Sequence, residues 1–331
     1  MRAVLIVNPT ATSTTPAARG LLANALKSRL ELTVEHTTHH GHGTELGHAA
    51  AENGVDLVVV HGGDGTISGV VNGLLGRPGT SPKERLPAVA VVPGGSANVL
   101  ARSLGISPDP VAATNQLIQL LDDYRSHQTW RRIGLIDCGE NWAVINAGMG
   151  VDAEVVAGVE AQRKKGLKVT PLRYWRVAVP VTIAFSRREP TLRLQLPDRD
   201  AIEGVHFAWV SNTTPWTYSN ERPMVTNPGC SFETGLGVFA VTGMKVFPTL
   251  RLLSQLLSKR PNPQAKQLIR DDDAAWLRIT SIGEPQATQF DGEYLGVRES
   301  MTFRAVPDAL AVAAPPKKIA LTWGNNQSDA R

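Results

Sequence analysis

The chain has 331 residues, of which 42% are hydrophobic and 19% are charged, and its formal net charge is +4 at pH 7. This length and apolar content support two domains with cores of their own and exclude a disordered chain. The net charge is too small for this length to indicate nucleic-acid binding by itself. The two cysteines, Cys138 and Cys230, are too few and too far apart for a disulfide framework, which predicts a reducing compartment.

No stretch of the sequence is typical of a secretion signal or of a membrane span. The first apolar run, from Ala3 to Val7, is followed at once by Asn8 and Pro9 and is far shorter than a signal-peptide core. No window approaches the roughly 18 uncharged apolar residues of a spanning helix. We therefore expect a soluble, cytoplasmic protein.

Up to about residue 125, short apolar runs alternate with stretches of helical periodicity. Strands that alternate with helices predict a parallel sheet covered by helices on both faces. We expect strands at 3–8, 32–37, 57–62 and 88–92, and helices at 17–30, 44–53, 66–75 and 97–104.

From about residue 129, apolar and polar residues alternate instead, as in antiparallel strands. The clearest stretches are 129–136, 142–147, 191–196 and 276–282, and the connections between them are rich in Pro and Gly. A short amphipathic helix is expected at 251–260, packed on the sheet.

The predicted fold class is an α/β N-terminal domain, with a parallel sheet flanked by helices, followed by a mostly antiparallel β domain. The first domain is placed at residues 1–128 and the second, β-rich domain at residues 129–304. The segment 305–331 is expected to return to the N-terminal domain, and its Pro-, Lys- and Asn-rich end is expected to fray.

A glycine-rich loop, Gly62-Gly63-Asp64-Gly65-Thr66, separates the third expected strand from the next helix. Its glycines let an anion approach the backbone N–H groups closely, and the helix dipole adds positive potential. Asp64 would repel bare phosphate unless a divalent cation lay between them, which favours a magnesium nucleotide. The alternative is a glycine-rich turn that binds nothing.

A second loop of the same kind, Gly94-Gly95-Ser96-Ala97-Asn98, follows the fourth expected strand. Ser96 stands where it can cap the helix or contact a phosphate. Alone, the loop could be an ordinary capped turn. Two such loops at the carboxyl ends of parallel strands share one edge of the sheet, where open α/β folds bind ligands.

These motifs resemble those of the soluble diacylglycerol kinase-like lipid kinases of bacteria, which are related to sphingosine and ceramide kinases. The first loop with Asn72-Gly73-Leu74 resembles the family's GGDGT-helix-NGL signature, and the second loop resembles its PxGTxN motif with Ser96 in place of threonine. Gln289 to Glu293, read QFDGE, resembles the late DGE motif. The resemblance covers most of the chain and implies that residues 1–128 are a nucleotide-binding catalytic domain and residues 129–304 a lipid-substrate domain.

The resemblance implies transfer of the ATP γ-phosphoryl group to the hydroxyl of a diacylglycerol-like lipid, with Mg²⁺ as cofactor. It makes Glu293 the general base, gives Asp64 the role of organising Mg-ATP, and places Asp291 with them as a catalytic acidic residue. The implied nucleotide contacts are Asn8, Pro9, Thr37, Gly62, Gly63, Asp64, Gly65, Thr66, Gly94, Gly95, Ser96 and Asn98. Without the resemblance, Asp291-Gly292 predicts a hairpin turn, and both interpretations can hold.

Several positions depart from the family pattern. Ser68-Gly69 stand where Asn-Glu is usual, and Val99 stands where an aspartate follows the PxGTxN loop. Some members hold a structural Mg²⁺ in a loop of the lipid domain, which here implies Ser231, Thr234 and Leu236, with Thr234 in place of the aspartate. Glu233 is the alternative carboxylate for that site.

The stretch 163–188 contains eight basic residues and no acidic one, interleaved with aromatic side chains. This composition favours peripheral contact with the anionic inner face of a membrane. A solvated face and nucleic-acid binding are the alternatives, and we expect no nucleic-acid partner. A homodimer is a possible assembly.

Other interpretations remain open at this point. NAD kinases and phosphofructokinase-type enzymes also carry a GGDGT loop, a sphingosine- or ceramide-type acceptor fits the same motifs, and the departures are compatible with a non-catalytic nucleotide- or lipid-binding regulator. The five histidines between His36 and His48 fall in a strand-to-helix connection and are interpreted as surface residues rather than a metal site.

Overall fold

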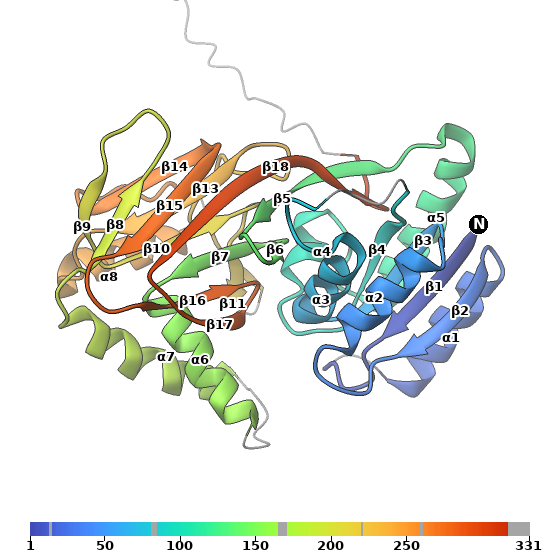
Figure 1. Cartoon of the computed structure of the whole chain (residues 1–331). Coiled ribbons are helices and arrows are strands. Elements are labelled where there is room, and N and C mark those ends of the chain that lie inside the picture. The colour runs from blue at the N-terminus through green and yellow to red at the C-terminus, as the bar shows by residue number, and fades with distance from the viewer. Residues whose placement is uncertain (13–14, 81–84, 165–170, 220, 259–260, 317–331) are drawn as a thin grey trace, which may run out of the picture.

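The computed structural model describes residues 1–12, 15–80, 85–164, 171–219, 221–258 and 261–316. The chain forms two lobes that lie side by side (Figure 1). The predicted fold class is confirmed, because a helix-flanked sheet with parallel strands is followed by an antiparallel β lobe.

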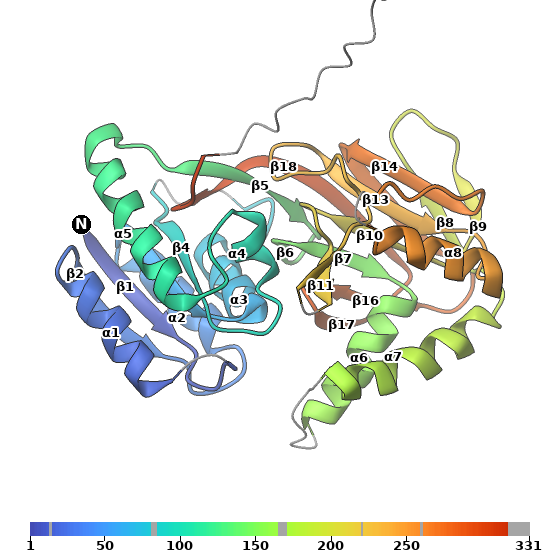
Figure 2. The ribbon, with the colours of Figure 1, turned by 180° about the vertical axis from the view of Figure 1, so that it is seen from behind.

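The N-terminal lobe is built on four parallel strands in the order β2-β1-β3-β4. Every residue of β3 and β4 is buried, as expected for strands that are covered on both faces. The helices surround this sheet, and Figure 2 shows the side of α1 and α5. The strands are β1 (Arg2–Val7), β2 (Glu31–His36), β3 (Leu57–Gly62) and β4 (Ala88–Pro93). The helices are α1 (Pro16–Lys27), α2 (His42–Glu52), α3 (Asp64–Leu75), α4 (Val99–Ser103) and α5 (Pro110–His127).

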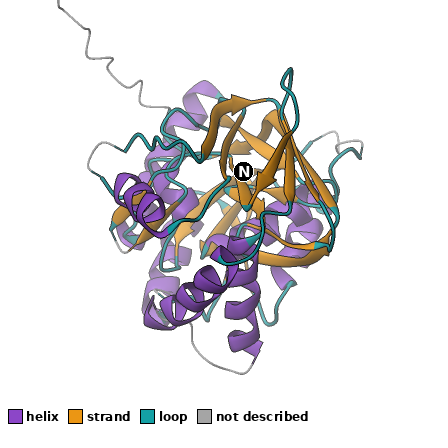
Figure 3. Cartoon of the chain, turned by 90° about the vertical axis from the view of Figure 1, so that its left-hand side faces the viewer, coloured by secondary structure: helices purple, strands orange, loops and turns teal. Residues whose placement is uncertain are grey.

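The C-terminal lobe contains a six-stranded antiparallel sheet in the order β14-β13-β10-β7-β16-β17. Side chains alternate between its two faces: Ala208 and Val210 enter the core between the sheets, whereas Phe207 and Trp209 enter the core under the helices. Figure 3 views this lobe with its strands in orange. The strands are β7 (Asn146–Met149), β10 (Phe207–Ser211), β13 (Leu236–Val241), β14 (Leu268–Ala274), β16 (Gln286–Phe290) and β17 (Glu293–Arg298).

A single long strand, β18 (Ser300–Val312), joins the two lobes. It pairs with β15 in the C-terminal lobe, with β5 along most of its length, and with β4 through Val312 and Val89. One ten-stranded sheet therefore runs through the molecule, and β18 crosses the predicted boundary at 304/305 without a break. The remaining strands are β5 (Arg131–Asp137), β6 (Trp142–Ala143), β8 (Leu192–Gln195), β9 (Ile202–Val205), β11 (Thr217–Ser219), β12 (Arg222–Met224) and β15 (Trp276–Ser281).

Two helices interrupt the region expected to be mostly β: α6 (Val151–Lys164) and α7 (Pro171–Ser186). The second contains Pro180 and a run of β-branched residues, a composition that disfavours a helix. The helix expected at 251–260 begins earlier, as α8 (Val246–Leu256), and residues 259–260 lie outside the described ranges. None of the helices in the described ranges has the length and apolar content needed to cross a bilayer.

Candidate active site at the meeting of two glycine loops

The two glycine loops meet at the carboxyl edge of the parallel sheet. The N–H of Gly94 donates a hydrogen bond to the carbonyl oxygen of Gly62 (2.8 Å). A β-carbon added to Gly95 would lie 2.7 Å from the Cα of Gly63, which is closer than two non-bonded carbon atoms approach one another. The two backbones therefore touch, and only a residue without a side chain fits at this crossing.

Gly95→Ala is expected to weaken ATP binding, because the added methyl group forces the two loops apart. We expect the Kd for ATP to rise by about 10-fold or more, as typical for loss of a preorganised phosphate contact. Isothermal titration calorimetry measures it. Gly20→Ala is the matched control, since a β-carbon there has no neighbour within 4 Å. Equal affinity in both variants would contradict the prediction.

Asn98 closes the second loop on itself. Its side-chain oxygen accepts the N–H of Gly95 (2.9 Å), its amide donates to the Gly95 carbonyl (2.8 Å), and its φ is 48°. Asn is one of the few side chains that tolerate this left-handed conformation. Asn98, not Ser96, is the N-cap residue of α4, so the capping interpretation of Ser96 is wrong; Ser96 is exposed at the tip of the loop.

Asp64 links the first loop to the start of α4. Its two carboxylate oxygens accept the N–H groups of Val99 (3.0 Å) and Leu100 (3.1 Å), where α4 has no other side-chain cap. Burial raises the pKa of Asp64, whereas these two bonds and the nearby Arg102 lower it. By contrast, α3 begins at Asp64 without a side-chain cap, which leaves the positive end of its dipole available to an anion.

The other predicted nucleotide contacts lie along the same edge. Asn8 follows β1, and its amide donates to the hydroxyl of Thr66 (2.9 Å). Its Oδ1 accepts the N–H of Thr10 (3.0 Å), which holds the turn that contains Pro9. Thr37 follows β2, and its N–H donates to the carbonyl oxygen of Val7 (2.9 Å). Strand ends thus gather these residues beside the first loop.

Glu293 reaches this edge from the other lobe. It is the first residue of β17, and a β-carbon placed on Gly65 would lie 4.0 Å from its Oε1. Its carboxylate therefore lies over the first turn of α3, beside the loop predicted to bind phosphates.

Asp291 occupies the turn that precedes Glu293, and its side chain points into the protein. Asp291 and Gly292 have φ values of 45° and 78° between the paired residues Phe290 and Glu293, so the hairpin interpretation is confirmed. The carboxylate accepts four hydrogen bonds: from the hydroxyl of Ser68 (2.7 Å) and from the N–H groups of Val144 (2.8 Å), Ile145 (2.8 Å) and Asn146 (3.1 Å).

Burial raises the pKa of Asp291, and the four hydrogen bonds lower it. The Asp291 carboxylate links α3, the helix that follows the first glycine loop, to the connection between β6 and β7. Its catalytic role stays a prediction, and this geometry favours positioning of Glu293 instead. Ser68, at a position where the sequence departs from the family pattern, supplies the link to α3.

A second link between the lobes uses the NGL motif. The amide of Asn72 donates to the carbonyl oxygen of Trp142 (2.9 Å), and its Oδ1 accepts the Trp142 N–H (2.8 Å). The neighbouring Gly73 packs against α2, where an added β-carbon would lie 2.0 Å from the carbonyl oxygen of Thr44. The sequence identified Asn72 as part of the NGL motif. Its partner, Trp142, lies 70 residues away and outside that motif.

Behind Asp291, the buried Gln289 connects the hairpin to α6. Its amide donates to the carboxylate of Asp152 (2.8 Å) and to Asn146 Oδ1 (3.2 Å), and its oxygen accepts the N–H of Gly292 (3.0 Å). Burial raises the pKa of Asp152 to about 6. Sequence inspection did not single out Asp152, because no pattern in the neighbouring residues marks it, and it named Gln289 only as the first residue of the QFDGE stretch.

The raised pKa of Asp152 predicts a pH-dependent stability. In the folded state Asp152 stays protonated up to about pH 6, whereas the ordinary pKa of an aspartate is 3.8. The stability that the protonated side chain gives to the folded state is therefore fully present below pH 3.8 and is lost as the pH rises through about 6. Urea unfolding should show that Asp152→Asn abolishes this loss, which amounts to roughly 3 kcal/mol. The exposed Asp123→Asn is the control, and parallel stability curves for wild type and Asp152→Asn would contradict the assignment.

The loop of the expected structural metal site is closed by hydrogen bonds of its own. The hydroxyl of Thr234 accepts the Ser231 N–H and donates to the Ser231 carbonyl (both 2.9 Å). Glu233 pairs with the guanidinium of Arg131 (2.6 Å), and Leu236 begins β13. Within the described ranges, no group of three or more His, Cys, Asp or Glu side chains is placed to hold a metal ion.

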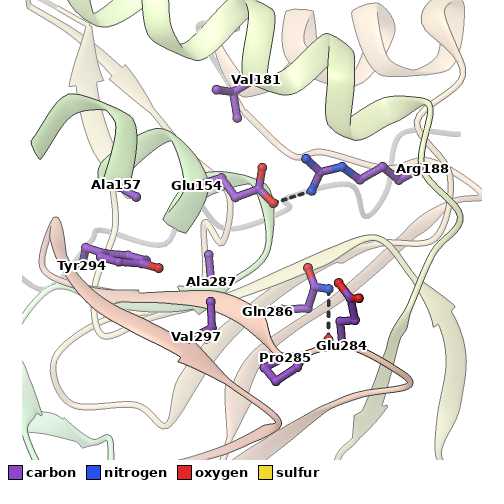
Figure 4. A pocket seen from close by; sticks show the side chains of 10 residues that line it. All are labelled: Glu154, Ala157, Val181, Arg188, Glu284, Pro285, Gln286, Ala287, Tyr294 and Val297. Atoms are coloured by element: carbon purple, nitrogen blue, oxygen red, sulfur yellow. Dashed lines mark hydrogen bonds and ion pairs between the residues drawn. The ribbon is translucent and has the colours of Figure 1, made fainter. Parts of the chain in front are cut away.

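A cavity of about 390 Å³ lies between α6, α7 and the β16–β17 hairpin (Figure 4). An ion pair between Glu154 and Arg188 (2.5 Å) crosses it, and Tyr294 lines one side. None of the predicted site residues lines this cavity. Of the basic stretch 163–188, residues 165–170 and the side chains of 163–164 and 171–175 lie outside the described residues, whereas Arg176, Arg187 and Arg188 are exposed.

Comparison with known proteins agrees with the motifs. Residues 2–123 match the family model of the diacylglycerol kinase catalytic domain. A protein of Chromohalobacter salexigens described as "Probable lipid kinase YegS-like" is 23% identical over 301 residues, which cover 91% of this chain and 89% of that protein. A diacylglycerol kinase of Bacillus subtilis is 36% identical over 114 residues, 33% of this chain and 35% of that protein.

The fold is similar to that of a solved bacterial structure. The crystal structure of a diacylglycerol kinase from Bacillus anthracis superposes with a TM-score of 0.68 at 18% identity, covering 95% of this chain and 97% of that one. The resemblance predicted from the motifs is therefore confirmed: residues 2–123 match the diacylglycerol kinase catalytic domain, and the chain is similar to bacterial proteins described as lipid kinases over most of its length.

Proposed function

We propose that the protein is an ATP-dependent lipid kinase that phosphorylates the hydroxyl of a diacylglycerol-like lipid. The observation that carries the proposal is the position of Glu293, whose carboxylate lies over the first turn of α3 at the edge where the two glycine loops meet. A kinase needs a site for the phosphates and a group that accepts the proton of the attacking hydroxyl. Both come together at this edge.

The reaction assigns a separate task to each part. The backbone N–H groups of the glycine loops and the uncapped start of α3 bind the phosphates. Glu293 accepts the hydroxyl proton while the hydroxyl oxygen forms a bond to the γ-phosphorus and the bond to the bridging oxygen of ADP breaks. Positioning and charge compensation, rather than covalent chemistry by the protein, provide the rate enhancement.

Magnesium fits this site with few protein ligands. Mg²⁺ is usually held by one or two carboxylates together with phosphate oxygens and water, so the single carboxylate of Asp64 beside the glycine loops suits a metal that arrives with the nucleotide. Asp64 is the residue that would hold it, through oxygen lone pairs not used by Val99 and Leu100. When bound, Mg²⁺ neutralises charge on the transferred phosphoryl group.

The proposed lipid acceptor is inferred from the way the similar proteins are described. The Chromohalobacter protein is described as a lipid kinase and the Bacillus proteins as diacylglycerol kinases. We extend that substrate class to this chain because the DGE carboxylate, Glu293, and both glycine loops occupy one site.

A phosphorylation assay with radiolabelled ATP tests the proposal. Diacylglycerol, sphingosine, ceramide and phosphatidylinositol are presented in vesicles, and NAD and a sugar phosphate are presented in solution, each with Mg²⁺ and with a chelator. We expect label in phosphatidic acid only when Mg²⁺ is present. Label in another lipid would change the proposed acceptor but retain the lipid-kinase assignment. Label in NAD or the sugar phosphate would overturn the lipid assignment. ATP binding without any labelled product would support a non-catalytic regulator.

A further inference from the structure

Helix α8 presents an unusually apolar surface to solvent. Leu252 and Leu256 bury one side of it against the sheet. On the adjoining side, Val246, Phe247 and Leu250 are 69%, 85% and 57% exposed. Leu253 and Leu257 continue the same stripe at 43% and 45% exposure. These five residues form what we call the α8 apolar face.

The α8 apolar face is not accounted for by ordinary surface composition. Twelve large hydrophobic residues are exposed in the described ranges, and five of them lie in this one face. Single exposed apolar residues are normal on a protein surface, whereas a contiguous stripe indicates a binding surface. The spacing places them along one side of the helix beside its buried side.

The charges in the sequence on either side of α8 have one sign. From Thr234 to Lys266 the chain contains five basic residues and no acidic one, and the next acidic residues, Asp271 to Asp273, lie in β14. Lys245 at the start of the helix and Arg251 within it are exposed. An apolar stripe accompanied by basic side chains is the pattern of a helix that lies in the interface of an anionic bilayer.

Helix α7 lies on the same face of the six-stranded sheet as α8. Val181 and Phe185 of α7 pack into the core cluster that also receives Leu252 and Leu256, so both helices cover one face of the six-stranded sheet (Figure 2). α7 also exposes apolar side chains, Ile183 among them. A second copy of the chain fits this surface less well, because a self-complementary contact would bring like charges together.

We propose that the α8 apolar face docks the protein on the surface of an anionic bilayer, with Phe247 and Leu250 inserted among the lipids. The proposal rests on the proposed function only in that the acceptor of a lipid kinase resides in a membrane. It assigns the insertion to α8, a helix outside the basic stretch 163–188.

Vesicle sedimentation of the full chain tests the docking without any catalysis. The probe is sucrose-loaded vesicles of equimolar phosphatidylglycerol and phosphatidylcholine, compared with vesicles of phosphatidylcholine alone. We expect binding to the anionic vesicles, and we expect Phe247→Ser combined with Leu250→Ser to lower the partition coefficient by at least about 10-fold. Leu21→Ser is the matched control, because Leu21 is a 68% exposed leucine on α1 in the other lobe. Undiminished binding of the double variant, or equal loss in the control, overturns the proposal.

A fluorescent label locates the contact directly. Cys138 and Cys230 are both buried, so a polarity-sensitive dye will react selectively with a cysteine introduced by Phe247→Cys or, as control, by Leu21→Cys. Anionic vesicles should shift the emission of the first label to the blue and leave the second unchanged. A label at position 247 that is already shielded before vesicles are added, in a chain that sediments as a dimer, would assign the face to a second copy and overturn the proposal.

The two proposals fail separately. Glu293→Gln should bind vesicles like the wild type, and the double variant should phosphorylate an acceptor presented in detergent micelles at the wild-type rate. If the chain binds vesicles through α8 but phosphorylates no lipid, the docking proposal stands and the kinase assignment is wrong. If the chain phosphorylates a micellar lipid but the α8 double variant still binds vesicles, the kinase assignment stands and the docking proposal is wrong.

Discussion

Replacing Glu293 by Gln is expected to lower kcat for phosphoryl transfer by about 10²- to 10⁴-fold, the usual contribution of a general base. The amide has nearly the same shape as the carboxylate but cannot accept the proton of the attacking hydroxyl. Because Glu293 lies over the start of α3 from the neighbouring lobe, the fold and the affinity for ATP should be retained. Initial rates with saturating ATP and lipid, beside the Kd for ATP, separate the two effects.

Glu299→Gln provides the matched control, since Glu299 follows the same strand and its side chain is exposed. Its rate should equal that of the wild type. A Glu293→Gln variant that keeps its rate within a few-fold would show that another group accepts the proton, or that proton transfer does not limit the reaction.

Asp291→Ala is expected to be the most destabilising of the substitutions considered for the site. It removes the acceptor of the Ser68 hydroxyl and of the N–H groups of Val144, Ile145 and Asn146. A buried donor without a partner costs about 1–3 kcal/mol, so the free energy of unfolding should fall by roughly 4 kcal/mol or more. Urea denaturation followed by circular dichroism measures the change.

Asp198→Ala separates this effect from backbone strain. Asp198 has a φ of 51°, close to the 45° of Asp291, but its side chain is exposed. A loss of stability in Asp291→Ala no larger than in Asp198→Ala would mean that the four hydrogen bonds contribute little. Asp291→Asn keeps one acceptor oxygen and should fall between Asp291→Ala and the wild type.

Apart from α5 (Pro110–His127), which was not predicted, the sequence predicted the N-terminal lobe well because its strands and loops follow from local patterns. Buried parallel strands are continuous apolar runs, and each glycine loop marks the point where a strand such as β3 or β4 gives way to a helix. The same locality predicted that the two loops share an edge, since parallel strands end on the same side.

The parts that were missed depend on partners distant in the chain. The β-branched residues of α7 are typical of a strand, and only packing on the six-stranded sheet stabilises them as a helix. The role of Asp64 as the cap of α4, and the four donors around Asp291, are likewise set by tertiary contacts. No pattern in the neighbouring residues marks such contacts.

The strand β18 has a consequence for how the site is assembled. One continuous sheet runs from β15 through β18 to β4. Asn72 hydrogen-bonds to Trp142, and Asp291 to Ser68, across the same boundary between the lobes. The orientation of the lobes is therefore fixed when the chain folds. Glu293 therefore stands over α3 before a nucleotide arrives, and substrate binding need not supply the free energy for domain closure.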